Sequence, residues 1–280
     1  MSGKGWALLI LRRSVSALAL AATCGLMLLP IFWTLSTSLK PNGEILAFPP
    51  RWLPNHPTFV HYLAVLKSDM PQYFLNSFII TAGTLTLTLG LALHVSYAVT
   101  RYNFRLKKMF MILLLCAMMM PGVANLIPIY LLANEVDLLD TYILLIVVYS
   151  AWLLPTAVWI LAEYFRSIPD SLDKAALVDG YSRWYAFYRI CLPLSRPGQA
   201  AAAIMVFVFV WNEFIIALTL TSSNAKRPVQ VGLHYYLTVL CIEWGEFTAA
   251  VIISLLPVVV LFVLFQRSFV SGMTTGAIKG

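Results

Sequence analysis

Polar side chains interrupt two stretches of the sequence that are otherwise strongly apolar. Trp211, Asn212 and Glu213 stand together within FVFVWNEFIIALTL, and Asn125 interrupts an earlier apolar stretch. A carboxylate, an amide and an indole can hydrogen-bond to the hydroxyl groups of a sugar and stack on its ring. Because an ionisable group at the centre of a membrane helix costs about 2.5 to 3.5 kcal/mol, we expect Glu213 to face a protein interior or a water-filled path. The alternative is that the triplet stabilises a contact between two membrane subunits.

The composition indicates that these side chains belong to a membrane protein. The chain of 280 residues is 60% hydrophobic and 11% charged, with a mean hydropathy of +0.83, outside the range of soluble domains. We predict an all-α polytopic membrane protein that forms a single membrane domain over 1–280. Its six spans are expected at roughly 15–37, 74–100, 109–132, 142–163, 198–221 and 247–265. The first apolar stretch lacks a small-x-small cleavage site before Lys40, which favours a retained span over a cleaved signal peptide.

The distribution of basic residues predicts the orientation. A net charge of +7 would suggest nucleic acid as the partner of a soluble protein, but here fourteen of the nineteen Lys and Arg residues fall in alternate segments between the spans. These segments are 1–14, 101–108, 163–197 and 266–280, and the positive-inside rule assigns them to the cytoplasm. We therefore expect both termini to be cytoplasmic and no nucleic-acid partner.

The third span is expected to be broken. Pro121, Gly122 and Pro128 should bend or loosen it, and Asn125 lies between them. Because broken membrane helices tend to line pathways, Asn125 is a candidate path residue. A hydrogen bond between neighbouring helices is the alternative role. For His94, inside the second span, we expect a packing role rather than proton transfer.

The longest polar interval on the basic side predicts a helical hairpin. Four residues of its first helix share one face by their spacing, Leu172, Ala175, Ala176 and Asp179. Asp170 or Ser171 is expected to cap this helix, and Gly180 to end it with a positive φ. The same spacing recurs at Trp184, Phe187, Tyr188 and Cys191, after which Leu192-Pro193 is expected to stop the second helix.

This interval resembles the coupling loop of bacterial ABC importer membrane subunits. That family carries Glu-Ala-Ala, three residues, Gly, nine residues, Ile, one residue and Leu-Pro, and residues 174–193 keep this spacing. Lys174 replaces the usual glutamate, and Asp173 is the candidate substitute for its carboxylate. The resemblance implies that the loop 166–197 contacts an ATPase through Asp173, Lys174, Ala175, Ala176, Asp179, Gly180, Trp184, Phe187, Ile190, Leu192 and Pro193. An ordinary amphipathic cytoplasmic loop is the plain alternative.

The C-terminal tail also resembles this family, in its carbohydrate-specific branch. The matching residues are Gly272, Thr274, Gly276 and Lys279. Such a short tail cannot form its own core, so it is expected to be disordered or held by a partner. The resemblance implies insertion between two ATPase subunits.

The two outside loops are candidate contact surfaces. In residues 38–73, Trp52, Phe59, His61 and Tyr62 suit either the lipid headgroup zone or a protein partner. The prolines of this loop favour extended chain. The loop 222–246 is implied by resemblance to reach a soluble sugar-binding protein, and a simple connector is the alternative.

Taken together, the resemblance implies the permease subunit of a maltose-type, ATP-driven sugar importer in an inner (plasma) membrane. The chain has no Walker A sequence, so it is expected not to be an enzyme and to bind no cofactor, with ATP and Mg²⁺ on partner subunits. The four cysteines and four histidines are too scattered for a metal site. The expected partners are a second permease subunit, an ATPase dimer, a soluble sugar-binding protein and the lipid bilayer. The alternatives are an ion-coupled secondary transporter, which would need a coupling carboxylate and internal repeats, and a receptor or scaffold.

Overall fold

A computed structural model describes residues 3–237 and 243–277, and within these ranges it contains helices and no strand. Four helices are long and apolar enough to cross a membrane, or six crossings result if two sharply bent pairs each count as one. The predicted all-α polytopic membrane fold is thereby confirmed. The chain divides into two compact units, residues 1–68 with 235–255 and residues 69–234 with 256–280.

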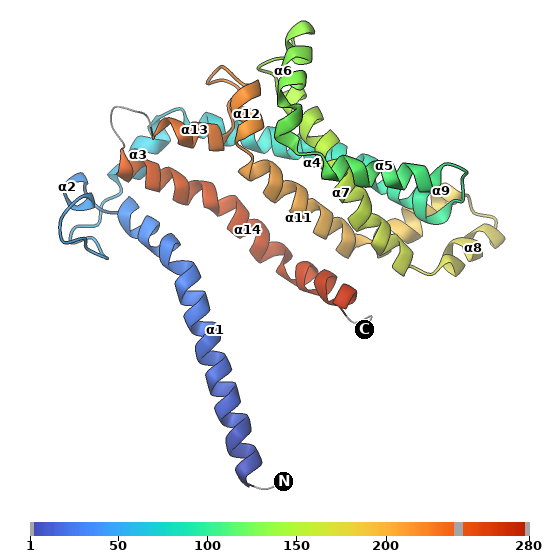
Figure 1. The fold of residues 1–280 in the computed structure, drawn as a ribbon, viewed down its shortest axis with the longest axis horizontal. Coiled ribbons are helices and arrows are strands. Elements are labelled where there is room, and N and C mark those ends of the chain that lie inside the picture. The colour runs from blue at the N-terminus through green and yellow to red at the C-terminus, as the bar shows by residue number, and fades with distance from the viewer. Residues whose placement is uncertain (1–2, 238–242, 278–280) are drawn as a thin grey trace. The chain divides into compact units, whose positions relative to one another are not determined.

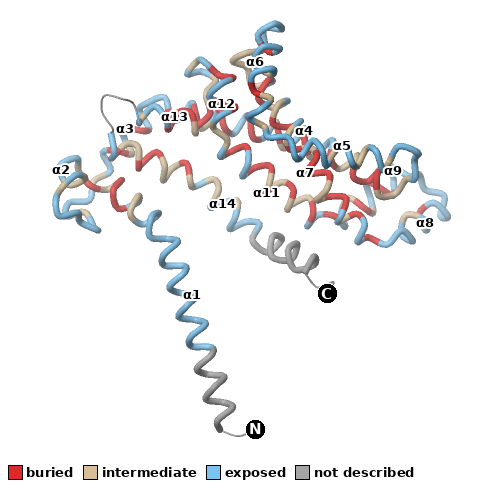
Figure 2. The backbone as a smooth tube through the Cα atoms, in the orientation of Figure 1, coloured by how far each residue is buried: buried red, intermediate tan, exposed pale blue. Residues whose placement is uncertain are grey.

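The first unit contains three helices and the start of a fourth. These are α1 (Gly3–Ser38), α2 (Asn42–Ile45), α3 (Val60–Lys67) and the first part of α14 (Trp244–Ala277) (Figure 1). The described side chains of α1 are exposed until its last turns (Figure 2). The expectation of extended chain in 38–73 was wrong in part, because α2 and α3 form between the prolines and α4 begins at Met70.

The second unit contains the later part of α14 and the remaining elements, whose bounds follow in chain order. They are α4 (Met70–Arg101), α5 (Lys107–Met119), the 3₁₀ helix η1 (Gly122–Asn125), α6 (Leu126–Glu135), α7 (Tyr142–Ser167), α8 (Asp170–Val178), α9 (Arg183–Tyr185), the π-helix η2 (Ala186–Cys191), α10 (Leu192–Leu194), α11 (Arg196–Asn212), α12 (Ile215–Leu220) and α13 (Val229–Tyr235). The spans predicted at 74–100 and 142–163 lie within α4 and α7.

Helices α4 and α7 pack side by side and run in the same direction. Tyr142 Oη donates to Asn76 Oδ1 at one end (2.7 Å), and Ser96 Oγ donates to the Val158 carbonyl further along (3.0 Å). Because the two helices run in the same direction, the chain must cross back from the end of α4 to the start of α7. Helices α5, η1 and α6 form this connection. Both α4 and α7 therefore end on the same side of the unit, where the hairpin begins.

Close approach of these helices depends on small side chains along α4. Thr81, Thr84, Thr88 and Ser96 are all buried, and a Cβ added at Gly83 would overlap Ile146 of α7. Small residues of this kind let membrane helices pack closely, since lipid supplies no hydrophobic drive for their association. Helix α11 packs antiparallel to α7, as the contacts of Gly198 with Tyr164 and of Phe209 with Trp152 indicate.

Two predicted spans are interrupted. The third bends by 91° between α5 and η1, at the Pro121-Gly122 pair that was expected to break it. The predicted fifth span, 198–221, is not one helix, because α11 ends at Asn212 and α12 begins at Ile215. The chain becomes helical again directly after each break, in η1 and α6 after the first and in α12 after the second.

Asp140 holds the loop that follows α12. Its φ is +59°, a left-handed conformation that Asp tolerates better than most residues. Its carboxylate accepts hydrogen bonds from the backbone N–H groups of Ser222 (3.0 Å) and Ser223 (3.1 Å). Burial raises the pKa of Asp140, but these hydrogen bonds and the charge of Arg227 outweigh burial and lower the pKa from its ordinary value of 3.8.

Replacing Asp140 by alanine should destabilise the protein by about 1–3 kcal/mol, because two backbone donors lose their acceptor. Asp140→Asn keeps an acceptor oxygen and the tolerance for positive φ, so it should cost less. Because the pKa is lowered on folding, the stabilisation is present above the unfolded-state value of 3.8 and is lost as the pH falls below it. Thermal unfolding of the purified protein should therefore separate wild type from Asp140→Asn at pH 7 and less so near pH 3. Equal unfolding temperatures for wild type and Asp140→Ala at pH 7 would contradict this role.

Candidate coupling hairpin and helix breaks

The hairpin after α7 turns at Gly180, as the sequence predicted. Gly180 has φ +83°. The N–H of Gly180 bonds to the Leu177 carbonyl (3.2 Å) and that of Tyr181 to the Ala176 carbonyl (2.9 Å). This pair of bonds is a Schellman motif, which satisfies the last carbonyls of α8 and fixes where the second arm begins.

Arg101, the last residue of α4, fastens the hairpin to the membrane helices. Its guanidinium pairs with Asp170 and, through Nε, with Asp173 (2.6 Å), and it donates to the Ile168 carbonyl (2.9 Å). The side chains of Arg101 and Asp173 are 8% and 13% exposed. Arginine suits this position because its planar fork can serve several oxygens at once.

The second arm also contacts this ion pair. The buried Cys191 Sγ donates to Asp173 Oδ1 at 3.0 Å. Asp173 is thus directed into the hairpin base and not outward. The expectation that it replaces the carboxylate missing at Lys174 was wrong, because that carboxylate already balances a buried cation.

Two expectations about the ends of the hairpin helices were also wrong. Pro169 is the N-cap of α8, and Asp170 pairs with Arg101 instead of capping. Pro193 does not stop the second arm, which stays helical from Arg183 to Leu194 and ends at Ser195. The π-helical turn before Pro193 is wider than an α-helical turn, which gives room to a ring that would otherwise meet the carbonyl four residues earlier.

The predicted coupling residues divide between the protein's own core and its surface. Three are buried or half-buried, Phe187 (2% exposed), Ala176 (4%) and Leu192. Phe187 belongs to the core cluster that also contains Tyr97 of α4 and Phe165 of α7, and Leu192 packs against this cluster. Those that are exposed are Lys174, Ala175, Asp179, Gly180, Trp184 and Pro193, while Ile190 is intermediate. We had expected Ala176 and Phe187 to lie on a docking face, and this was wrong, because the chain itself covers both.

An aromatic cluster joins the second arm to α4. His94 contacts the Gly90 carbonyl through Nδ1 (2.6 Å) and Tyr188 Oη through Nε2 (2.9 Å). Its ring lies against Phe187, and Trp184 stacks on Tyr188. His94 is therefore a hydrogen-bonded packing residue, as predicted.

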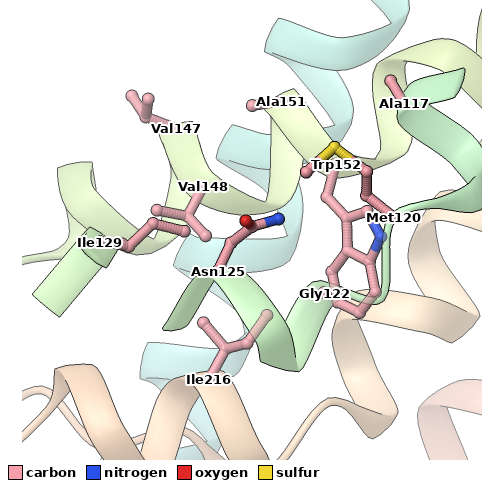
Figure 3. Close-up of a pocket in the computed structure, with 10 residues that line it drawn as sticks. All are labelled: Ala117, Met120, Gly122, Asn125, Ile129, Val147, Val148, Ala151, Trp152 and Ile216. Carbon is pink, nitrogen blue, oxygen red and sulfur yellow. The ribbon is translucent and has the colours of Figure 1, made fainter. Parts of the chain in front are cut away.

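The break in the third span opens a pocket of about 340 Å³. Asn125 lies in it, and Figure 3 shows its amide between Val148 and Trp152. Gly122 is required here, because an added Cβ would overlap the Trp152 ring. The lining residues are Ala117, Met120, Gly122, Asn125, Ile129, Val147, Val148, Ala151, Trp152 and Ile216.

The second break is organised by Glu213. Its carboxylate accepts from the backbone N–H groups of Ile216 (2.8 Å) and Ala217 (3.0 Å), which are free donors in the first turn of α12. Tyr149 Oη of α7 donates to the same group at 2.6 Å. Glu213 therefore faces the protein interior, one of the two environments expected for it, and it starts a helix there.

The other members of the triplet lie in different surroundings. Trp211 is 1% exposed and stacks on Phe207, with Phe78 at its edge. Asn212 is exposed and bonds to the Val208 carbonyl of its own helix (2.7 Å). Ile216 connects Asn125 with the Glu213 break, because it lines the pocket and its backbone N–H donates to Glu213.

The tail residues are only partly described. Gly272, Thr274 and Gly276 belong to α14, which is helical to Ala277, so the first of the two expectations for the tail, disorder, does not hold for these residues. No proline follows Pro257, so every later residue keeps its helical donor. Lys279 lies outside the described residues.

Sequence reasoning missed three residues with central roles, Arg101, Tyr149 and Asp140. Arg101 was counted only as an inside charge, and nothing in the sequence pairs it with residues about seventy positions later. Tyr149 carries no signal within its apolar stretch. Asp140 lies between two apolar stretches, and nothing in the sequence connects it with Ser222 and Ser223, about eighty positions later.

Comparison with known proteins defines the class. Residues 85–275 match the family described as the binding-protein-dependent transport system inner membrane component. The chain is 34% identical to the sulfoquinovosyl glycerol transport system permease protein SmoH of Agrobacterium fabrum, over 90% of this chain and 89% of that one. It is also 34% identical to the trehalose/maltose transport system permease protein MalG of Thermococcus litoralis, over 95% of each.

A solved structure has the same fold. It is a bacterial ABC transporter involved in the import of the acidic polysaccharide alginate, with a TM-score of 0.83, 21% identity, and coverage of 95% of this chain and 98% of that one. The chain belongs to the family of inner membrane components of binding-protein-dependent transport systems. It is a multi-pass membrane permease subunit.

The Arg101–Asp173 pair should be coupled energetically. Arg101→Met leaves the buried Asp173 carboxylate without its partner, which should destabilise the hairpin by about 3–5 kcal/mol. Asp173→Asn should cost less, because Arg101 keeps its pairing with the exposed Asp170. The double variant should cost less than the two single changes combined. Hydrogen exchange of residues 170–191 measures this, with Arg166→Ala as the matched control. Arg166 pairs with Glu163 at 3.1 Å on the surface, so its loss should cost under about 1 kcal/mol. An Arg101 variant no worse than the control would show that the ion pair does not fasten the hairpin.

Glu213 and Asn212 should differ in stability effects. Glu213→Leu removes the acceptor for three donors and should destabilise by at least about 1–3 kcal/mol, whereas Asn212→Leu changes an exposed side chain and should stay within about 0.5 kcal/mol. Thermal unfolding of each purified variant distinguishes them. If both variants unfold at the wild-type temperature, Glu213 does not organise the break.

Proposed function

We propose that this chain is one of two membrane subunits of an ATP-driven carbohydrate importer. The sugar class is supported by the two similar permeases, which are named for the transport of sulfoquinovosyl glycerol and of trehalose/maltose. In this proposal a soluble binding protein delivers the sugar, and a separate ATPase dimer supplies the energy with its own ATP and Mg²⁺. Both termini and the hairpin lie in the cytoplasm.

The hairpin carries the proposal, as the element on which the ATPase acts. The Schellman motif at Gly180 defines its turn, and the ion pairs of Arg101 connect its base to α4. Its surface exposes apolar and aromatic side chains. The exposed residues are Leu172, Leu177, Val178, Tyr181, Trp184, Tyr185 and Tyr188, of which Val178 is 87% and Trp184 65% exposed. Apolar groups presented so openly on the polar side of a membrane protein suit a partner groove. Lys174, Ala175 and Asp179 lie on the same exposed arm.

The translocation path, in this proposal, runs past the pocket at the third-span break. Asn125 supplies an amide and Trp152 an aromatic ring, which suit brief contact with a hydroxylated ring. Asn212 is exposed and can face the path directly, whereas Trp211 and Glu213 support it from the interior. The second permease subunit closes the path on its open side.

Two further contacts belong to the proposal. The tail that contains Gly272, Thr274, Gly276 and Lys279 contacts the ATPase dimer, as its resemblance implies. The loop 222–246 approaches the binding protein. It is anchored at its start, where Asn76 Nδ2 donates to the Arg227 carbonyl (2.8 Å) and Ser77 Oγ accepts from Val229 N–H (2.8 Å).

Val178→Asp should separate coupling from folding. Val178 is too exposed to support the chain's own core, so the variant should insert and assemble its helices normally, but a charge on the docking face should reduce ATPase association. The complete transporter is reconstituted in proteoliposomes, and ATP hydrolysis is measured with and without sugar-loaded binding protein. We expect loss of stimulated hydrolysis and uptake for Val178→Asp and near-normal values for the control Val178→Ala. Wild-type stimulation in Val178→Asp would rule out this face as the coupling surface.

A further inference from the structure

The segment after α1 is tied to the end of that helix by a buried lysine. Lys40 is 1% exposed, donates through Nζ to the Arg51 carbonyl (2.6 Å) and lies 4.2 Å from the centre of the Trp33 ring. Burial lowers the pKa of Lys40, and the nearby Glu44 carboxylate partly offsets this. His61 Nε2 contacts the Lys40 carbonyl at 2.9 Å. The lysine therefore holds both its own loop and α3.

This tie folds the segment back alongside the span. Ser36 Oγ donates to the Trp52 carbonyl, and the rings of Trp33 and Trp52 meet edge to face with centroids 5.2 Å apart. Since Trp33 lies five residues before the end of α1 at Ser38, Trp52 is held about 7 Å back along the helix axis. Figure 1 shows the α2 segment beside this end of α1.

The folded-back segment exposes large apolar side chains at that level. Phe48 is 95% exposed, Leu46 80%, Leu53 65% and Trp52 54%. Arg51, whose side chain is also exposed, stands beside them. The helix beside them is itself apolar, since α1 contains a candidate span over Arg13–Ser38 with a mean hydropathy of 2.1.

We propose that residues 46–53 form an interfacial foot that inserts Leu46, Phe48 and Leu53 into the headgroup and acyl boundary of the bilayer. Trp and Tyr collect at this depth because they combine an apolar ring with a polar group, and an arginine there can reach lipid phosphates. Lipid is favoured over a protein partner because the tie fixes the segment level with the last turns of a membrane-spanning helix. The proposal requires only that α1 spans the membrane and does not depend on the transported substrate.

Photocrosslinking in nanodiscs tests the foot directly. A benzoylphenylalanine probe is introduced by Phe48→p-benzoylphenylalanine, and in a second variant at Leu53, in the complete transporter with binding protein present. Both side chains are exposed, so the probe should not disturb folding. Leu26, which is 73% exposed in the middle of α1, serves as the lipid-facing reference, and the exposed Ala225 serves as the aqueous reference.

We expect phospholipid adducts at positions 48 and 53, identified by mass, with yields close to that at Leu26 and well above that at Ala225. Adducts to the binding protein or to the second membrane subunit would overturn the proposal and identify a protein contact instead. Yields no higher than at Ala225 would overturn it as well, because the segment would then lie in water.

Discussion

The pairing of Arg101 with Asp170 and Asp173 determines how the hairpin relates to the membrane helices. Arg101 is the last residue of α4, and its guanidinium also holds the Ile168 carbonyl at the end of α7. A buried charge that loses its partner is costly, so the hairpin base cannot separate from α4 while the rest of the fold is kept. Because α4 and α7 run in parallel, one ion-pair cluster links the ends of both helices to the same hairpin. A force applied to the outer arm is consequently passed to two membrane helices at once.

The two helix breaks obey the same requirement for satisfied polar groups. Irregular backbone at membrane depth is tolerated only where it is buried in protein or lines a cavity. At the second break, Glu213 meets the free donors of α12 and is itself held by Tyr149. At the first, the chain turns around a pocket into which Asn125 projects. Ile216 belongs to both places, so a rearrangement of one break is felt at the other. The polar residues in these spans thus divide into those that maintain the breaks and those that remain open to a ligand.

Local rules predicted the features that depend on nearby residues. The turn at Gly180, the break at Pro121-Gly122 and the membrane class all follow from residue type and short spacing. Which hairpin residues are buried could not be predicted from these rules. The helical repeat shows that Ala176 and Phe187 each lie on an apolar face of their own helix, but it does not show whether the chain itself or a partner covers that face. The ion pairs of Arg101 could not be predicted either, because Asp170 and Asp173 come close to it only after α4 and α7 have packed. The prediction that Pro193 ends the second helix failed because a π-helical turn accommodates its ring, and residue propensities do not predict such a turn.

The departure at Lys174 shows how one position changes the interpretation of its neighbour. Adjacent residues of an α-helix point about 100° apart, so a carboxylate at 173 cannot occupy the place of one at 174. Asp173 faces Arg101 and Cys191, where it is needed to balance a buried cation. The Lys174 side chain is exposed on α8, so the hairpin presents a positive charge where many family members present a negative one. The exposed surface of this hairpin therefore offers a partner a cation and a group of aromatic and apolar side chains, and its exposed carboxylates are those of Asp179 at the turn and Asp170 at the base.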